Sequence, residues 1–142
     1  MAVALLDTNV LFASASARDV YHDDALDIVR AVDHGDLPEA IVTDYVVGET
    51  LNLVREKLGP DAATEMLDRF VEGAHFELVH TPKADFTAAQ AHFRRYRELS
   101  FVDATLIAYA DREDVDYLYS FDDDFDAVDG LVRLDSAANP YQ

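Results

Sequence analysis

Four acidic side chains stand at positions where they could do metal chemistry together. Asp7 and Asp122 each follow a short apolar run, and Glu49 and Asp103 lie in segments whose apolar residues have helical spacing. A few carboxylates suit Mg²⁺ or Mn²⁺, hard cations that take oxygen ligands and keep positions free for water and phosphate oxygens. Like charges about 4 Å apart repel by roughly 4 kcal/mol at an effective dielectric constant of 20, so a cation would belong to such a cluster. The pattern predicts a divalent metal site at Asp7, Glu49, Asp103 and Asp122.

Each of these acids also has an ordinary structural explanation. An aspartate after a strand, such as Asp7 or Asp122, commonly accepts hydrogen bonds from nearby backbone amides. Glu49, between Val46 and Leu53 on its helix, could be a solvated side chain. The joint chemistry of the four acids, more than any single position, favours the metal site.

Asp103 carries the strongest individual signal. It shares a helical face with Leu106, Ile107 and Ala110, and a carboxylate on a buried face needs a partner or a cation. Ser100 and Asp103 also have the spacing of a capping box at a helix N-terminus. The two roles are compatible, because an acid in the first helical turn can also face a metal.

Short apolar runs and longer helical patterns alternate along the chain, which is typical of an α/β fold with a parallel sheet covered on both faces. The expected strands are Val3–Leu6, Ala40–Thr43, Phe76–His80, Tyr117–Ser120 and Leu131–Leu134. The expected helices run from Asp19 to Gly35, from an Asp44 cap to Leu58, from Pro60 to Val71, from Thr81-Pro82 to Leu99, and from Phe101 to about Arg112. Ligands bind beyond the carboxyl ends of the strands in such sheets, where Asp7 and Asp122 are expected.

The composition limits the remaining possibilities. With 29 acids, 11 bases and a net charge of −18, the chain has the haloarchaeal type of composition, because molar salt screens such self-repulsion. Cysteine is absent, which excludes thiolate metal sites and thiol nucleophiles. No apolar run is long enough to span a bilayer. We expect one cytoplasmic, halophilic domain over residues 1–142, with no membrane association.

At these acids the sequence resembles the PIN-domain family, and in particular the small ribonuclease toxins called VapC. The resemblance covers nearly the whole chain and rests on four ordered motifs: Leu5-Leu6-Asp7-Thr8-Asn9-Val10-Leu11, Thr43-Asp44-Tyr45-Val46-Val47-Gly48-Glu49-Thr50-Leu51, Leu99-Ser100-Phe101-Val102-Asp103-Ala104, and Ser120-Phe121-Asp122-Asp123-Asp124-Phe125-Asp126 followed by Gly130-Leu131.

The resemblance implies a PIN-like three-layer α/β/α domain with a five-stranded parallel sheet, whose four acids converge at one end. It also implies an endoribonuclease that uses Mg²⁺ or Mn²⁺ to hydrolyse RNA, forms a homodimer and is inhibited by a cognate antitoxin protein, as the toxin of a type II pair. Asp122 best matches the fourth acid of the family, and Asp124 and Asp126 could share its role.

Other residues are assigned more weakly. Thr8, Asn9 and Ser120 could hydrogen-bond the metal-binding carboxylates, although ordinary capping at a strand end explains them equally well. Arg94, Arg95 and Arg97 could bind phosphates, although a charged run on a long helix is more often a solvated face.

Several alternatives remain open at this stage. A haloacid-dehalogenase-like phosphatase needs a second aspartate where Asn9 stands, and a receiver-like domain needs a lysine at a strand end, for which Lys83 is badly placed. A metal-free ribonuclease would use two of the five histidines, which are His22, His34, His75, His80 and His92. A housekeeping RNA-processing nuclease and a catalytically silent binding module of the same fold are the remaining possibilities.

Overall fold

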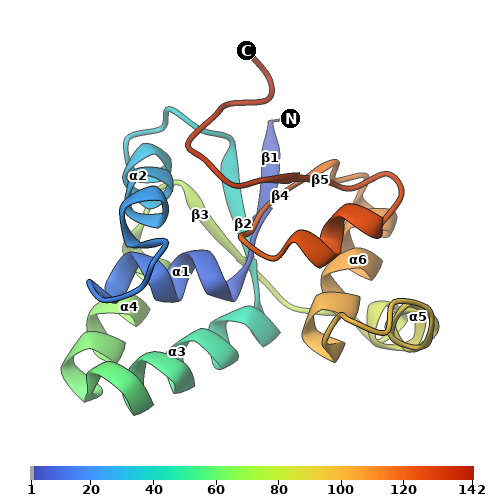
Figure 1. Ribbon diagram of the computed structural model, residues 1–142, viewed down its shortest axis with the longest axis horizontal. Coiled ribbons are helices and arrows are strands. Elements are labelled where there is room, and N and C mark those ends of the chain that lie inside the picture. Colours follow the sequence, from blue (N-terminus) through green and yellow to red (C-terminus); the bar gives the residue numbers. More distant parts are fainter. Residues whose placement is uncertain (1) are drawn as a thin grey trace.

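Five parallel strands form the centre of the molecule, in the order β3-β2-β1-β4-β5 (Figure 1). The structure is a computed structural model that describes residues 2–142. The strands are β1 Val3–Leu6, β2 Glu39–Thr43, β3 Phe76–Val79, β4 Tyr117–Tyr119 and β5 Val132–Leu134. The expected α/β class and five-stranded parallel sheet are confirmed, with every strand within one residue of its expected bounds.

Helices cover both faces of this sheet. They are α1 Thr8–Ala15, α2 His22–Asp33, α3 Asp44–Leu58, α4 Pro60–Glu72, α5 Lys83–Arg95, α6 Phe101–Glu113 and the 3-10 helix η1 Asp123–Ala127. The chain moves through β1, β2 and β3 in one direction across the sheet and then returns to β4 and β5. Because such crossovers are right-handed, the reversal places α1–α4 on one face and α5, α6 and η1 on the other (Figure 1). The three-layer arrangement follows from this order of strands.

The central strands explain why the sheet is stable. In β1, Ala4, Leu5 and Leu6 are completely buried, as is Leu118 in β4. A strand covered on both faces is expected to be apolar throughout rather than alternating. Within residues 2–142, no helix combines the length and the apolar composition that crossing a membrane requires.

Helix α1 was not expected from the sequence. Asp7 caps it, and Val10, Leu11 and Ala13 are buried in the core. The helix is only eight residues long and lacks a charged face, because it packs against α2 and α3 and buries most of its residues. Its apolar residues therefore give no helical contrast between a buried and a solvated side.

Two further expectations about helices were wrong in detail. Helix α5 ends at Arg95, four residues before Leu99, because the chain turns at Tyr96 to bring the buried Leu99 back to the core. Thr43, not Asp44, caps α3 by accepting a hydrogen bond from the backbone N–H of Val46.

The Asp44 carboxylate instead ties two segments together. Its Oδ1 accepts hydrogen bonds from the backbone N–H and the hydroxyl of Thr81, at 3.0 and 2.7 Å. Asp44 therefore links the start of α3 to the segment that follows β3.

Candidate metal-binding site

The candidate site lies where the order of the sheet reverses. β1 and β4 are neighbours, but the segments that follow them leave toward opposite faces, which opens a crevice beyond their carboxyl ends. The backbone N–H of Asp7 donates to the carbonyl of Tyr119 at 3.1 Å, so Asp7 lies level with Ser120 on the adjacent strand. Residues more than a hundred positions apart in the sequence meet at this point.

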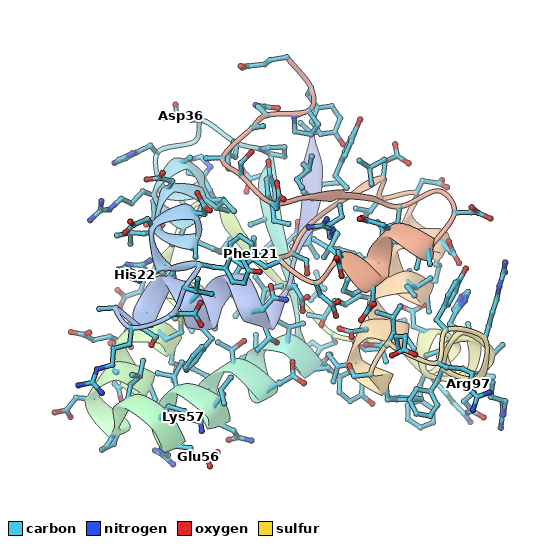
Figure 2. The ribbon with its side chains drawn as sticks, viewed as in Figure 1. His22, Asp36, Glu56, Lys57, Arg97 and Phe121 are labelled. Atoms are coloured by element: carbon cyan, nitrogen blue, oxygen red, sulfur yellow. The ribbon has the colours of Figure 1, made fainter. Side chains whose placement is uncertain are left out.

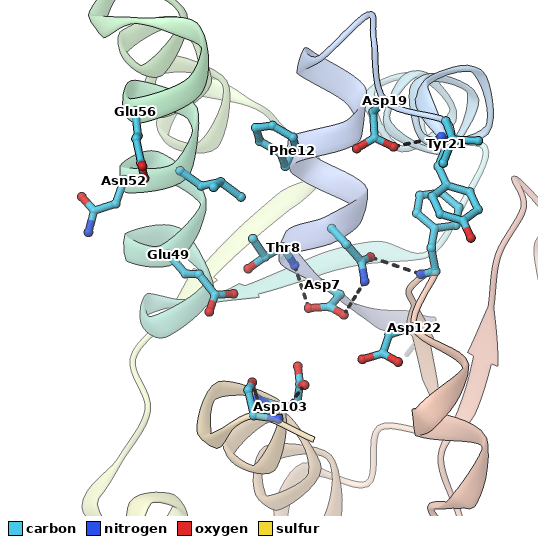
Figure 3. Close-up of a pocket in the computed structure, with 15 residues that line it drawn as sticks. Asp7, Thr8, Phe12, Asp19, Tyr21, Glu49, Asn52, Glu56, Asp103 and Asp122 are labelled. Atoms are coloured by element: carbon cyan, nitrogen blue, oxygen red, sulfur yellow. Dashed lines mark hydrogen bonds between the residues drawn. The ribbon is translucent and has the colours of Figure 1, made fainter. Parts of the chain in front are cut away.

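A cavity of about 840 Å³ occupies this crevice, and all four predicted acids line it (Figure 3). Asp7 comes from the end of β1, Glu49 from α3, Asp103 from the start of α6 and Asp122 from the segment after β4. None of the fifteen residues that line the cavity is Lys or Arg. The acids therefore face one another without a basic side chain among them.

Asp7 is the most buried of the four, with 4% of its surface exposed. Its Oδ1 accepts from the backbone N–H of Thr8 at 2.8 Å, and its Oδ2 accepts from the Ser120 hydroxyl at 2.7 Å and the Asn9 amide at 3.2 Å. These contacts fix the orientation of the carboxylate. Asn9 and Ser120 contact Asp7 as expected, whereas Thr8 does so through its backbone.

The electrostatics of Asp7 are unfavourable for a negative charge. Burial, the nearby Asp103 carboxylate and, more weakly, Glu49 raise the pKa of Asp7 to about 7, against the lowering effect of the bonds from Ser120 and Thr8. A buried charge with no opposite charge is costly in proteins. The residues that line the site therefore provide no positive charge to stabilise the Asp7 carboxylate.

Asp103 is half-buried at the first turn of α6. The expected capping box is present: the Asp103 backbone N–H donates to the Ser100 hydroxyl at 3.1 Å, and the Ser100 backbone N–H donates to Asp103 Oδ2 at 3.0 Å. Burial and the charges of Asp122 and Glu49 raise the pKa of Asp103, although the Ser100 bonds oppose this. Capping occupies one carboxylate oxygen and leaves Oδ1 free of protein donors among residues 2–142.

Asp122 and Glu49 complete the group in different ways. The backbone N–H of Asp122 donates to the Ser120 hydroxyl at 3.0 Å, and its Oδ1 accepts from the backbone N–H of Asp124 at 3.0 Å. Glu49 is exposed on α3 and extends toward the cavity (Figure 3). Both carboxylates are thus more accessible than that of Asp7.

The other acids of the closing motif lie outside the cavity. Asp126 forms a two-pronged ion pair with Arg133, at 2.9 and 3.1 Å, which also lowers the pKa of Asp126. Carboxylate oxygens of Asp122, Asp123 and Asp124 come within 4.8 Å of one another, but Asp123 and Asp124 are exposed and do not line the cavity. Of the acids in this motif, only Asp122 lines the cavity within residues 2–142.

The donor set fits a hard divalent cation. The four carboxylates offer oxygen ligands, and such an ion would supply the missing positive charge beside Asp7. The hydroxyl of Thr8, which also lines the cavity, is buried and has no hydrogen-bond partner among the described residues. A buried hydroxyl of this kind is normally satisfied by a water or a ligand.

The residues on which the alternatives depended lie elsewhere. None of the five histidines lines the cavity within residues 2–142. The Nδ1 of His22, for example, lies 2.7 Å from the carbonyl oxygen of Ala13. Lys83 is exposed at the start of α5 and also lies outside the cavity. Arg94, Arg95 and Arg97 are exposed, and Figure 2 shows Arg97 beside α5 at the outer edge of the molecule. These positions favour the carboxylate site over a histidine-based or lysine-assisted one.

Sequence reasoning did not assign eight of the fifteen residues that line the cavity. Five of them are apolar, namely Phe12, Val20, Tyr21, Leu53 and Phe121, and three are polar, namely Asp19, Asn52 and Glu56. The only signal in the sequence was Val20-Tyr21, an apolar pair among polar residues just before a predicted helix.

Known proteins resemble the chain in both sequence and structure. The model of the PIN domain family matches residues 4–131. A protein called VapC ribonuclease, from Archaeoglobus fulgidus, is 35% identical over 78 residues, which cover 55% of this chain and 49% of that protein. The matched region therefore spans about half the length of this relative.

Solved structures match over most of the chain. VapC20 of Mycobacterium tuberculosis, described as a toxin that cleaves the sarcin-ricin loop, has a TM-score of 0.76 at 25% identity, covering 91% of this chain and 96% of that one. VapBC2 of Rickettsia felis, bound to a promoter DNA fragment, has a TM-score of 0.67 at 15% identity, with coverages of 93% and 97%. PAE2754 of Pyrobaculum aerophilum has a TM-score of 0.62 at 19% identity, with coverages of 94% and 90%.

The family model covers most of the chain, the sheet has the expected five parallel strands, and the acids of all four motifs line one cavity. The chain belongs to the PIN-domain family.

Proposed function

We propose that this protein is a divalent-metal-dependent endoribonuclease that hydrolyses phosphodiester bonds of RNA. The observation that carries the proposal is the cavity at the sheet reversal, where four carboxylates face one another with no basic side chain among the lining residues. The name of the Archaeoglobus relative, a VapC ribonuclease, and the description of VapC20 as a toxin that cleaves the sarcin-ricin loop support RNA as the substrate.

In this proposal Asp7 and Asp103 hold one Mg²⁺ or Mn²⁺ ion, and Glu49 and Asp122 hold a second ion or orient the attacking water. When bound, such an ion polarises a phosphate oxygen and lowers the pKa of a coordinated water. Asn9 and Ser120 keep the Asp7 carboxylate in one orientation, and Ser100 does the same for Asp103. If Glu49 orients the attacking water, its exposed carboxylate would also accept the proton that the water loses.

The same proposal includes the biological setting of the enzyme. We place it as the toxin of a type II toxin–antitoxin pair, a cytoplasmic homodimer inhibited by a cognate antitoxin. Support comes from solved structures of similar fold that are toxin–antitoxin complexes, among them those from Rickettsia felis and Klebsiella pneumoniae. The net charge of −18 supports activity in a salt-rich cytoplasm.

Cleavage of a labelled structured RNA in about 1 M KCl tests the enzymatic part of the proposal. We expect cleavage with Mg²⁺ or Mn²⁺, none in EDTA, and a loss of at least about a hundredfold in Asp103→Asn, because this change removes a ligand charge but keeps the shape of the side chain. Asp111→Asn is the matched control, since Asp111 is an exposed aspartate near the other end of the same helix. Full activity in EDTA, or in Asp103→Asn, would contradict the proposed site.

A further inference from the structure

The wall of the cavity beside the acids carries a pair of stacked aromatic rings. The rings of Tyr21 and Phe121 lie 4.5 Å apart between centroids, with only 6° between their planes. Both residues line the same cavity as the four acids. Tyr21 is 45% exposed and the adjacent Val20 is 88% exposed. A flat apolar surface at the edge of the site is therefore exposed to solvent.

Hydrogen bonds through the Asn9 side chain connect this aromatic pair to Asp7. The Asn9 side chain accepts from the backbone N–H of Phe121 at 3.1 Å and donates to Asp7 Oδ2 at 3.2 Å. The loop that carries Tyr21 is held by Asp19, whose Oδ1 accepts from the Tyr21 backbone N–H at 2.9 Å. The aromatic pair is thus held at a fixed place relative to the innermost acid.

The charge of the cavity raises the question of how RNA binds there. Proteins usually gain most of their affinity for nucleic acids from Lys and Arg contacts to phosphates, and salt weakens these contacts steeply. Among residues 2–142, no Lys or Arg lines this cavity, and the chain carries a net charge of −18. Base stacking on an aromatic ring needs no positive charge, and it contributes to binding of single-stranded nucleic acids.

We infer that Tyr21, backed by Phe121, binds an unpaired nucleobase of the RNA beside the bond that is cleaved. This inference rests on the proposed function, and it assigns to Tyr21 the recognition of a base next to the cleaved bond. A paired base is covered on both faces by its neighbours, whereas an unpaired base can leave the stack and lie on an aromatic side chain. Tyr21 is then a residue that positions the substrate, and the acids perform the chemistry.

The absence of tryptophan from the chain allows a direct test. Tyr21→Trp in an Asp103→Asn background keeps a flat aromatic ring at the site and provides the only tryptophan fluorescence. We expect a short single-stranded RNA of random sequence, added with Mg²⁺, to quench this fluorescence. A sugar-phosphate oligomer of the same length without bases, and a fully paired RNA, should not. Val71→Trp in the same background is the control, because Val71 is exposed on α4 outside the cavity.

The outcomes of this titration distinguish a failure of the inference from a failure of the proposed function. Binding of fluorescently labelled RNA, followed by anisotropy, without any change in tryptophan emission would overturn the inference and leave the nuclease proposal standing. Absence of RNA binding altogether would overturn both. Quenching by an Arg- and Leu-rich peptide but not by RNA would assign the aromatic pair to a protein partner and also overturn the inference.

Cleavage kinetics give a second, independent test. We expect Tyr21→Ala to raise KM for single-stranded RNA about tenfold, the size of one base-stacking contact, with a smaller change in kcat. Tyr21→Phe should behave like the wild type, since stacking needs the ring and not the hydroxyl. Phe93→Ala is the matched control, because Phe93 is an aromatic residue of similar exposure, 47%, that does not line the cavity. Equal KM values for Tyr21→Ala and Phe93→Ala would contradict the inference.

Discussion

Two aspartates in the described part of the chain are almost completely buried, and the charges around them differ. Asp85 in α5 is 1% exposed and forms a two-pronged ion pair with Arg112 of α6, with Nε–Oδ1 and Nη2–Oδ2 distances of 2.7 and 3.0 Å. Asp7 is 4% exposed and has only neutral hydrogen-bond donors around it. A positive charge therefore accompanies Asp85, which joins two helices, whereas none accompanies Asp7, which lines the cavity.

Replacing Arg112 by a neutral residue would leave Asp85, like Asp7, without a nearby positive charge. We expect Arg112→Met to lower the free energy of unfolding by about 3–5 kcal/mol, because Asp85 would become a buried charge without a partner. Chemical denaturation in molar KCl measures this change, with Arg94→Met, at an exposed position of α5, as the control. A loss below about 1 kcal/mol would mean that water reaches Asp85 and that its burial carries no such cost.

The pH dependence of stability should show that Asp7 lacks a nearby positive charge. Because the folded-state pKa of Asp7 is raised from 3.8 to about 7, its stabilising contribution is complete below about pH 4 and is lost as the pH rises through 7. In EDTA, the wild type should therefore lose about 3–4 kcal/mol relative to Asp7→Asn between pH 4 and pH 8. Denaturation of both proteins across this range measures the difference. A constant difference would show that the Asp7 carboxylate is not destabilised by its surroundings.

Removing a neutral hydrogen-bond donor of Asp7 should have a smaller effect than changing a charged residue, but it should still lower activity. Ser120 is fully buried, and its hydroxyl donates to Asp7 while it accepts from Asn9 and from the backbone of Asp122. Ser120→Ala should lower metal affinity or cleavage by about 10- to 100-fold, the usual effect of removing a group that orients a metal ligand. Mg²⁺ titration and cleavage rates measure the effect.

Ser14→Ala is the control for this change. Ser14 is also a buried serine, but its hydroxyl donates to the carbonyl of Leu11, within α1. Equal losses of activity in the two variants would show that Ser120 acts through general stability and not through Asp7.

Local patterns in the sequence predicted most of the fold. The strands were recognisable because each is a short apolar run, and the parallel sheet followed from their alternation with helices. Helix α1 could not be recognised, because burial on most of its surface removes the polar face that marks a helix. The early end of α5 depends on the buried position of Leu99, which no local pattern specifies.

The four predicted acids all line the cavity, whereas most of the residues around them were not predicted. The positions of Asp7, Glu49, Asp103 and Asp122 followed from strand ends, helical spacing and ordered motifs. The stack of Tyr21 on Phe121 joins residues a hundred positions apart, and the pairing of Asp126 with Arg133 depends on the packing of η1 beside β5. Contacts of this kind are set by tertiary structure, so a single sequence contains no direct record of them.

The adjacency of β1 and β4 has a consequence for synthesis of the protein. During translation Asp7 emerges more than a hundred residues before its partner Ser120 and the acid Asp122. Contacts between such distant positions form late in folding, because a long loop must close first. A ribosome-bound chain that ends before β4 lacks both residues. A nuclease assembled in this order would be inactive until the residues of β4 and the segment after it have been synthesised.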